Sequence, residues 1–225
     1  MRAPVSVILP TLNAAPTLGP TLAALGEALT EGLIREVIFA DGGSNDDTAQ
    51  IAEEVGASFL PCPRGRGMQM AAAARQAQGR WLLFLHADSI LQTGWSGTVA
   101  DHLRHPDKAG YFRLAFDETT LPARSVAGWA NLRARMFGLP YGDQGVLISR
   151  RLYDETGGYD DIPLMEDVAL ARKLRGKWRA LPVRITTSAE KYRRDGWIRR
   201  SFKNAGLVLR YRLGADPRKL AREYR

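Results

Sequence analysis

The chain has 225 residues, of which 45% are hydrophobic and 25% are charged, and its formal net charge at pH 7 is +8. This composition is typical of a soluble globular protein with one large domain, and the single cysteine, Cys62, excludes an intrachain disulfide and a thiolate zinc cluster. No uncharged apolar run reaches the roughly 18 residues of a membrane span, and the N-terminus lacks the pattern of a signal peptide, so we expect a cytoplasmic protein.

The first 90 residues alternate between β-rich runs and helical patterns. We predict strands at 5–10, 36–41, 57–62 and 80–88, and helices at 16–29, 48–55 and 68–78. The strands are nearly continuous apolar runs, which is typical of a parallel sheet covered by helices on both faces. The pattern therefore predicts a doubly wound α/β fold, and in such folds the ligand binds at the carboxyl ends of the strands.

The second half is less regular. We predict a strand at 109–117, a strand followed by a helix from about Arg150 that Gly157 and Gly158 terminate, another helix from Glu166, a strand past Gly176 and then basic helix. Residues 118–142 carry Pro, Gly and aromatic residues, which favours a mobile or substrate-facing segment. His102 and His105 fall at a predicted helix end, where we expect them to be solvated.

Polar residues follow each of the first four predicted strands. Thr11 and Asn13 follow the first strand, Asp41 ends the second, Arg64 and Arg66 follow the third, and His86 and Asp88 end the fourth. Because the carboxyl ends of parallel strands meet at one edge of a sheet, we expect these side chains to converge on a ligand.

The stretch at the end of the second strand reads ADGGSNDDT, from Ala40 to Thr48. An acid in this place often holds a base or a ribose, but the same stretch also fits a plain turn in which Gly42 and Gly43 supply positive φ. No G-x-G-x-x-G follows the first strand, which argues against a nicotinamide or flavin cofactor.

The end of the fourth strand reads HADS, from His86 to Ser89. Asp88 offers a carboxylate, and strand alternation points His86 the same way, so the pair could ligate Mn²⁺ or Mg²⁺ together with substrate phosphates. The alternative is a core histidine followed by an N-cap. Further along, Glu166 and Asp167 begin a helix, where one of them could be a general base or both could simply complement the helix dipole.

Together, these stretches resemble the family 2 glycosyltransferases, which are inverting enzymes with the GT-A fold. The resemblance runs in order through residues 4–175 and is carried by VSVILPTLN, IFADGGSNDDT, GRGMQMAAAARQAQGRWLLFLHADS and GVLISRRLYDETGGYDDIPLMEDVALARKL. The chain looks especially like a short bacterial subgroup that has H-A-D in place of the D-x-D metal motif. Gly42 stands where the family usually has a second acid, and His86 stands where it has the first aspartate of D-x-D.

The resemblance implies transfer of a sugar from a nucleotide-diphosphate sugar, of the UDP type, to an acceptor hydroxyl, with assistance from Mn²⁺ or Mg²⁺. Asp167 would be the catalytic base, with Glu166 as the fallback, and the metal would be held by Asp88, with His86 as a conditional ligand. The residues that would bind the nucleotide sugar are Pro10, Thr11, Asn13, Asp41, Ala87 and Asp88. To these we add Arg64 and Arg66 from their position, because the bidentate geometry of their guanidinium groups suits a diphosphate. By this resemblance, the catalytic domain spans residues 1–180, with a nucleotide-sugar-binding half at 1–108 and an acceptor-side half at 109–180.

Residues 181–225 form a predicted basic amphipathic segment. Residues 172–225 contain 18 basic and 4 acidic residues, a net charge of +14, whereas residues 1–171 contain 14 and 20, a net charge of −6. The mixture of basic and apolar residues favours a helix lying on an anionic membrane, and a helix packed on the body is the alternative. A membrane-bound segment would suit a lipid-linked acceptor and a peripheral location on the inner face of the membrane.

Two rival functions fit parts of the sequence. A nucleotidyltransferase could use a similar α/β sheet, but its usual Gly-rich loop with a basic residue does not follow the first predicted strand. The basic segment could belong to a nucleic-acid-binding protein, yet the body is acidic and contains no recognised nucleic-acid module, so we expect no nucleic acid partner.

Overall fold

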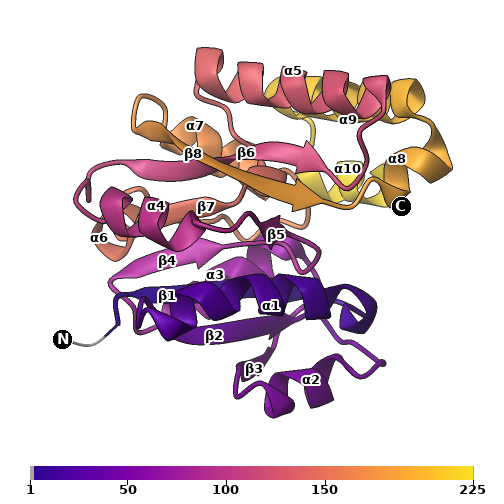
Figure 1. Ribbon diagram of the computed structural model, residues 1–225. Helices are drawn as coiled ribbons and strands as arrows, with labels where there is room; N and C mark the ends of the chain where they lie inside the picture. The colour runs from indigo at the N-terminus through magenta and orange to yellow at the C-terminus, as the bar shows by residue number, and fades with distance from the viewer. Residues whose placement is uncertain (1–2, 225) are drawn as a thin grey trace.

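The computed structural model describes residues 3–224 and contains one sheet of eight strands in this range (Figure 1). The strands are β1 Val5–Thr11, β2 Ile34–Asp41, β3 Ser58–Pro61, β4 Trp81–Phe84, β5 Ile90–Leu91, β6 Ala109–Phe116, β7 Val146–Ser149 and β8 Trp178–Thr187. The helices are α1 Ala15–Thr30, α2 Thr48–Glu54, α3 Arg66–Gln76, α4 Trp95–His102, α5 Leu121–Phe137, α6 Arg150–Glu155, α7 Glu166–Lys173, α8 Glu190–Asp195, α9 Trp197–Arg212 and α10 Pro217–Tyr224, with a 3₁₀ turn η1 at Gly142–Gln144.

The strand order is β3-β2-β1-β4-β7-β6-β8-β5. Strands β1 to β4 run parallel to one another, and β6 runs parallel to β8, whereas β7 is antiparallel to both of its neighbours and β5 is antiparallel to β8. Helices α1 and α4 lie on one face of the sheet and α3 lies on the other (Figure 1). The predicted doubly wound, mostly parallel α/β fold with a helical C-terminal extension is therefore confirmed.

The side chains of β1 alternate between two apolar cores. Val5, Val7 and Leu9 pack into one core with residues of α1 and α4, whereas Ile8 packs into the other core with residues of α3 and α7. Because side chains alternate across a strand, a short apolar run can bury residues on both faces of the sheet. This burial fixes the strand ends that carry the candidate site.

Residues 118–142, which we predicted to be a mobile or substrate-facing segment, contain the long helix α5. Thr120 caps its first turn by accepting a hydrogen bond from the backbone N–H of Ala123 at 3.4 Å, and Gly138, at φ 60°, ends it. The side chain of Asn131 accepts from the backbone N–H of Leu114 at 2.9 Å and donates to its carbonyl at 3.0 Å, which ties α5 to β6. We did not predict this helix, because its inward residues are alanines and its large apolar residues face outward.

His102 corrects a second prediction, since it is buried and not solvated. Its ring lies edge-on to Trp81, with centroids 5.6 Å apart, and its Nε2 donates to the carbonyl of Lys108 at 3.1 Å. Burial lowers the pKa of His102 to about 4, so it is a neutral core residue at physiological pH.

The C-terminal segment is packed on the body of the protein. Strand β8 runs across the predicted boundary at residue 180, and helices α8, α9 and α10 follow it. Leu207 of α9 and Leu220 of α10 are buried against Met165 and Val168, at the start of α7. Within residues 3–224, no helix is both long enough and apolar enough to cross a bilayer.

Candidate active site

The carboxylate of Asp41 organises the loop that follows β2. Asp41 is buried and accepts hydrogen bonds from the Thr11 hydroxyl at 2.9 Å, from the backbone N–H groups of Gly43 and Ser44 at 2.8 and 2.7 Å, and from the Ser44 hydroxyl at 2.5 Å. Burial alone would raise the pKa of Asp41, but the hydrogen bonds from Ser44, Gly43 and Thr11 outweigh it, and the pKa is lowered. All four acceptor positions of the carboxylate are therefore used within the protein.

The loops after β1 and β2 are locked to each other. Asn13, at φ 50°, accepts a hydrogen bond from the backbone N–H of Asn45 at 2.9 Å, and its own N–H donates to the Ser44 hydroxyl at 2.8 Å. Asp46 accepts from the N–H of Ala15 at 3.0 Å, at the start of α1. These contacts bring the predicted residues Thr11, Asn13 and Asp41 together as one rigid platform.

A second group, which we call the Arg66 cluster, consists of Arg66, His86, Gly142, Glu166 and Asp167. The Arg66 Nη1 donates to His86 Nε2 at 3.3 Å, and its Nε lies 3.6 Å from Glu166 Oε1. Because a guanidinium only donates, His86 Nε2 is the unprotonated nitrogen, and its lone pair faces Arg66. The cluster thus joins the start of α3, the loop after β4 and the start of α7.

His86 and Asp88 lie in a turn and not on a strand, which corrects the argument from strand alternation. Strand β4 ends at Phe84, and the N–H of Ser89 donates to the carbonyl of His86 at 3.1 Å. The Thr187 hydroxyl at the end of β8 donates to Asp88 Oδ2 at 3.3 Å, and the Thr21 hydroxyl donates to the carbonyl of Ala87 at 3.0 Å. Side chains of β8 and α1, and not the pleat, therefore set the orientation of this turn.

The imidazole of His86 is neutral at physiological pH. The residue keeps some exposed surface, but its ring is closely surrounded, and burial, followed by the nearby charges of Arg66 and Lys191, lowers its pKa well below the ordinary value. A neutral imidazole is the form that ligates metals.

Gly142 allows the 3₁₀ turn η1 to approach His86 closely. A Cβ at position 142 would lie only 2.9 Å from His86 Nε2, so a larger residue would displace the ring. The N–H of Gly142 donates to Asp167 Oδ2 at 3.0 Å, and the N–H of Val168 donates to Asp167 Oδ1 at 2.7 Å. Each oxygen of Asp167 therefore keeps one acceptor position for a further donor.

Glu166, the first residue of α7, is buried. Burial raises its pKa to about 7; the charge of Arg66 opposes the rise and that of Asp167 adds to it. The approach of α3 to α7 also depends on Gly67, because a Cβ there would lie 2.6 Å from the carbonyl oxygen of Ile162 and 2.9 Å from the Cβ of Glu166. With a pKa of about 7, Glu166 can hold or release a proton near neutral pH.

Sequence reasoning missed two charged residues at this site. Asp143, in η1, has a buried Oδ1 that meets no hydrogen-bond partner in the described part of the chain, and burial raises its pKa. Lys191, in α8, is solvent-accessible, yet burial and the charge of Arg66 lower its pKa while Asp88 opposes that shift. The signal available for Asp143 was an acid in the stretch YGDQG, where Gly142 and Gly145 flank Asp143 and Gln144. Nothing in the sequence linked Lys191 to Asp88.

The candidate residues do not form a self-sufficient metal centre. Among residues 3–224, no group of three or more His, Cys, Asp or Glu side chains could hold a metal ion. Asp88 and His86 offer two ligands, and the lone pair of His86 already accepts from Arg66. This donor set fits an ion that takes its remaining ligands from a substrate, provided that Arg66 moves away from His86.

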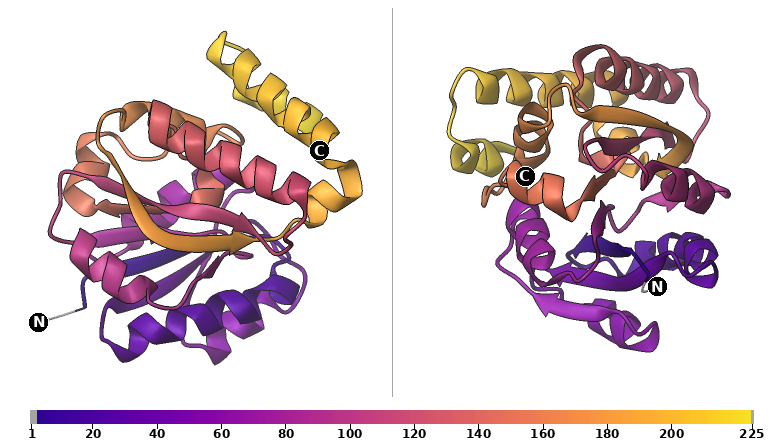
Figure 2. Two further views of the ribbon diagram at one scale, coloured as in Figure 1. Left: turned by 45° about the horizontal axis from the view of Figure 1, so that its top comes forward. Right: turned by 90° about the vertical axis from the view of Figure 1, so that its left-hand side faces the viewer.

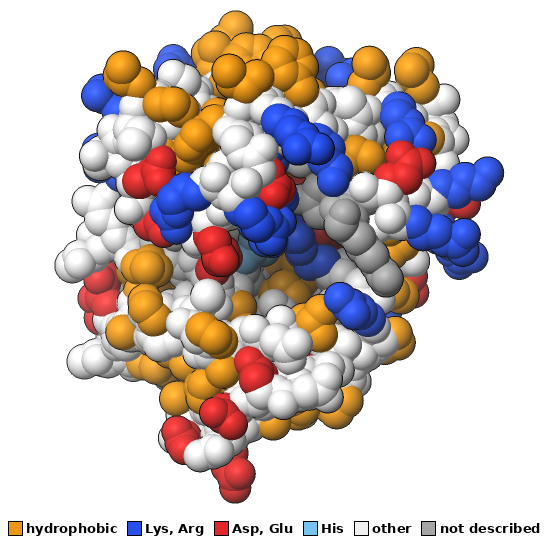
Figure 3. Space-filling model, turned by 90° about the vertical axis from the view of Figure 1, so that its right-hand side faces the viewer, with side chains coloured by type: hydrophobic (Ala, Val, Ile, Leu, Met, Phe, Trp, Pro, Cys, Tyr) orange, Lys and Arg blue, Asp and Glu red, His pale blue; other side chains and the backbone are white. Residues whose placement is uncertain are grey.

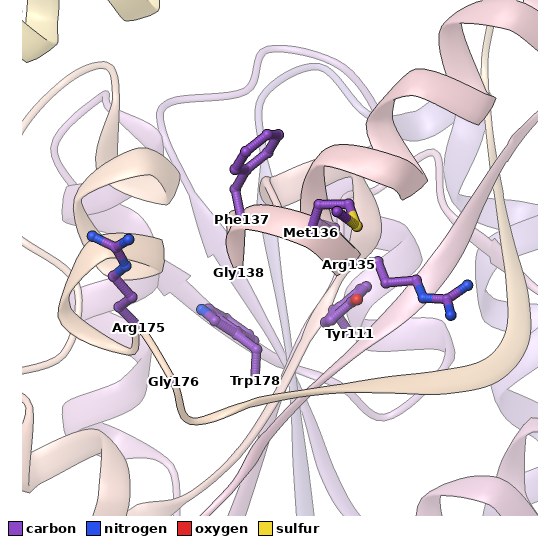
Figure 4. Close-up of a pocket in the computed structure, with 9 residues that line it drawn as sticks. Tyr111, Arg135, Met136, Phe137, Gly138, Arg175, Gly176 and Trp178 are labelled. Atoms are coloured by element: carbon purple, nitrogen blue, oxygen red, sulfur yellow. The ribbon is translucent and has the colours of Figure 1, made fainter.

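The face that carries these residues is hollowed. Figure 3 shows a depression between the two halves of the molecule, with a histidine side chain at its edge and Lys and Arg side chains along its upper margin. A separate pocket of about 360 Å³ lies between the end of α5 and the amino-terminal parts of β6 and β8, where Tyr111 and Trp178 line it (Figure 4). That pocket is at the opposite end of these strands from the Arg66 cluster and contains none of the candidate residues.

Comparisons with known proteins identify the family and the fold of the chain. A family model described as glycosyl transferase family 2 matches residues 6–149. Among solved structures, the mannosyltransferase PcManGT from Pyrobaculum calidifontis, in complex with GDP-Man and Mn²⁺, has a TM-score of 0.66 at 20% identity, over 96% of this chain and 66% of that one.

Two further structures are similar. TarS 1–349 from S. aureus has a TM-score of 0.62 at 17% identity, over 83% of this chain and 60% of that one, so the chain spans about 60% of its length. Glucosyl-3-phosphoglycerate synthase from Mycobacterium tuberculosis has a TM-score of 0.56 at 20% identity, over 83% of this chain and 70% of that one. At these identities the likeness establishes a shared fold. No curated protein matches the chain in sequence.

Proposed function

Since the family match covers more than half of the chain, the protein belongs to glycosyl transferase family 2, and we propose that it transfers a sugar from a nucleotide-diphosphate sugar to an acceptor hydroxyl. The observation that carries the proposal is the Arg66 cluster. Arg66 lies 3.6 Å from Glu166 and donates to His86, and Gly142 donates to Asp167, which supports a site between the proposed donor-binding and acceptor-binding halves. We also assign the chain to a short bacterial subgroup with H-A-D in place of D-x-D.

The donor class is supported by the ligands of similar structures. PcManGT was solved with GDP-Man, and TarS 1–349 was solved with UDP and with UDP-GlcNAc. In our proposal the donor is a UDP-sugar, and its nucleoside lies on the platform formed by the loops after β1 and β2. The residues of this pocket are Pro10, Thr11, Asn13, Asp41 and Ala87. Because the acceptor positions of Asp41 are filled, Asp41 shapes the pocket, and the base meets the surrounding backbone.

The diphosphate lies against the start of α3 in this proposal. Arg66 begins this helix and Arg64 is exposed just before it, so guanidinium groups and the positive end of the helix dipole both favour phosphate. Asp88, with His86 after displacement of Arg66, would hold Mn²⁺ or Mg²⁺ delivered with the donor. A divalent cation there neutralises negative charge on the leaving nucleotide diphosphate.

Asp167 is the proposed catalytic base. Backbone N–H groups of Gly142 and Val168 fix its carboxylate, which keeps a free acceptor position on each oxygen for an acceptor hydroxyl. Proton removal by Asp167 lets the hydroxyl oxygen attack the anomeric carbon directly, so one displacement inverts the configuration. Glu166, with a pKa of about 7, is the alternative base.

The acceptor binds on the side formed by residues 109–180, and residues 1–108 bind the donor. The partnerless Oδ1 of Asp143 is buried close to Asp167, so a substrate hydroxyl is a suitable hydrogen-bond partner for it. We propose that the acceptor is lipid-linked, which suits the basic residues of segment 181–225 near the site, such as Lys191.

A panel of nucleotide sugars, with and without Mn²⁺, tests the proposal by thermal shift and by product analysis. We expect stabilisation by a UDP-sugar and release of a nucleoside diphosphate. Release of pyrophosphate would favour the nucleotidyltransferase alternative instead. If no nucleotide sugar shifts the melting temperature, the proposed donor class is wrong.

A further inference from the structure

Helix α5 has small residues on its buried face and large apolar residues on its exposed face. Its buried positions are Ala123, Ala127, Ala130 and Ala134, which repeat at helical spacing against the protein. The exposed positions include Leu121, Trp129, Leu132, Met136 and Phe137. A surface helix of a monomeric protein normally places its large apolar side chains inward, so this reversed pattern indicates that the outer face of α5 meets another apolar phase.

Helix α9 continues this surface. Leu207 faces the protein, whereas Ile198, Phe202, Leu209 and Leu213 are exposed. The spacing of these four residues places them along one side of the helix. Helices α5 and α9 are in contact and lie at the same end of the molecule in both views of Figure 2.

We call the exposed apolar residues of α5 and α9, together with Leu213, the apolar ridge. It contains nine of the fourteen exposed large hydrophobic residues in the described part of the chain. Figure 3 shows hydrophobic side chains gathered at this end of the molecule, with Lys and Arg side chains among them. Such a concentration on two neighbouring helices is not the scattered exposure that is normal for a protein surface.

The charge of the two helices selects the partner. Helices α5 and α9 contain eight Lys or Arg residues and no Asp or Glu. Arg124 and Arg135 of α5, and Arg199 and Arg212 of α9, are exposed beside the ridge. A second copy of the chain would bring two positive surfaces together, whereas an anionic lipid surface offers both opposite charge and an apolar layer.

We propose that the apolar ridge docks the protein onto an anionic lipid bilayer. Trp129 and Phe202 enter the interfacial region of the bilayer, and the flanking arginines contact lipid phosphates. Neither helix crosses the bilayer in this arrangement, because each lies along its surface. The proposal does not depend on the transferase activity and would stand if that activity were different.

Vesicle flotation of the full chain tests the proposal. The wild type should float with phosphatidylcholine vesicles that contain phosphatidylglycerol, bind less at high salt, and bind little to phosphatidylcholine alone. The double variant Trp129→Ser/Phe202→Ser should lose on the order of tenfold or more in affinity. Val55→Ser, which changes an exposed apolar residue directly after α2, is the matched control and should bind like the wild type.

Tryptophan quenching by brominated lipids locates the docking face. Trp129 is 60% exposed and lies in the ridge, so quenching of tryptophan fluorescence should be strong in the wild type. Quenching should be much weaker in Trp129→Phe, although this variant should still float with vesicles. The proposal is overturned if the wild type ignores anionic vesicles at low salt, or if the double variant binds as well as Val55→Ser does. A wild-type dimer that the double variant abolishes would assign the ridge to a second copy instead. Far-UV circular dichroism and urea titration check that the variants are folded.

Discussion

At the scale of single residues, the two carboxylates at the start of α7 have different environments and different expected roles. Asp167 is held by backbone N–H groups and keeps acceptor positions, whereas Glu166 is buried beside Arg66 with its pKa raised to about 7. Because their surroundings differ in this way, one acid can act as a base while the other holds a proton.

Asp167→Asn should reduce transfer by about 100-fold to 10,000-fold, because the amide cannot accept the proton of the acceptor hydroxyl. Donor affinity should change little, since Asp167 does not touch the platform formed by the loops after β1 and β2. The measurement is single-turnover transfer combined with donor titration by thermal shift. Near-normal transfer in this variant would move the base to Glu166, and Glu166→Gln would then be the inactive form.

Glu166→Gln should also change how stability depends on pH. The folded protein binds the Glu166 proton more tightly than the unfolded chain does, because the pKa rises from 4.5 to about 7. Stability therefore falls as the pH rises from about 4.5 through about 7, by about 3 kcal/mol in total, and stays constant once Glu166 is ionised in both states.

Denaturant titrations at about pH 5 and about pH 8 measure this effect. Glu166→Gln should lose less stability than the wild type between the two pH values, whereas Glu155→Gln, at an exposed glutamate, should follow the wild type. Equal pH dependence in all three proteins would mean that Glu166 is already ionised in the folded state.

Asp88→Ala should weaken donor binding only when Mn²⁺ is present. Asp88 contributes the carboxylate of the proposed ion site, and its partner Thr187 holds it in the turn after β4. Thermal shift with a UDP-sugar, with and without Mn²⁺, separates an effect on the ion from an effect on the fold. If the variant and the wild type respond alike in both conditions, Asp88 does not hold the ion.

At the scale of elements, Asn131 connects α5 to the sheet. Its side chain pairs with both backbone groups of Leu114, as a neighbouring strand would, and its Oδ1 also lies 3.3 Å from the Gln144 side chain. Asn131→Ala leaves these groups without partners and should lower the free energy of unfolding by about 1–3 kcal/mol. Leu132→Ala, at the adjacent exposed position, should change stability by less than about 0.5 kcal/mol. Urea titration compares the two, and equal losses would argue against this role of Asn131.

The sequence predicted those elements whose large apolar residues face the core. Strands β1, β2 and β4 are apolar runs, and α1 and α7 have clear helical patterns or starts, so their positions were recognisable. Helix α5 was missed because its inward residues are alanines and its large apolar residues face outward. Strand β5 was missed because two residues carry no periodicity.

The candidate site was predictable only where its residues follow strand ends or fall in family motifs. Thr11, Asn13 and Asp41 are indeed brought together, and so are Arg66, His86 and Asp167. Their contacts were not predictable, since the Arg66 bond to His86 and the Thr187 bond to Asp88 depend on how the halves of the sheet meet. For the same reason, the sequence did not indicate that Lys191 lies near Asp88 or that Asp143 lies near Asp167.

At the scale of the whole molecule, the C-terminal helices connect the apolar ridge to the start of α7. Leu207 of α9 and Leu220 of α10 pack against Met165 and Val168, which flank Glu166 and Asp167. Helix α9, which together with Leu213 supplies four of the nine ridge residues, therefore packs against the start of α7, where the proposed base lies. A loss of packing there should affect both stability and transfer.

Leu220→Ala tests this connection. Removing a fully buried leucine should lower the free energy of unfolding by about 2–5 kcal/mol, and the loosened start of α7 should reduce turnover even where the protein remains folded. Leu213→Ala, at a position that is 80% exposed, is the matched control and should leave stability and turnover on a soluble acceptor unchanged. Urea titration and steady-state kinetics below the unfolding transition measure both quantities. If Leu220→Ala loses stability but keeps full turnover, the C-terminal helices support the fold without positioning Asp167.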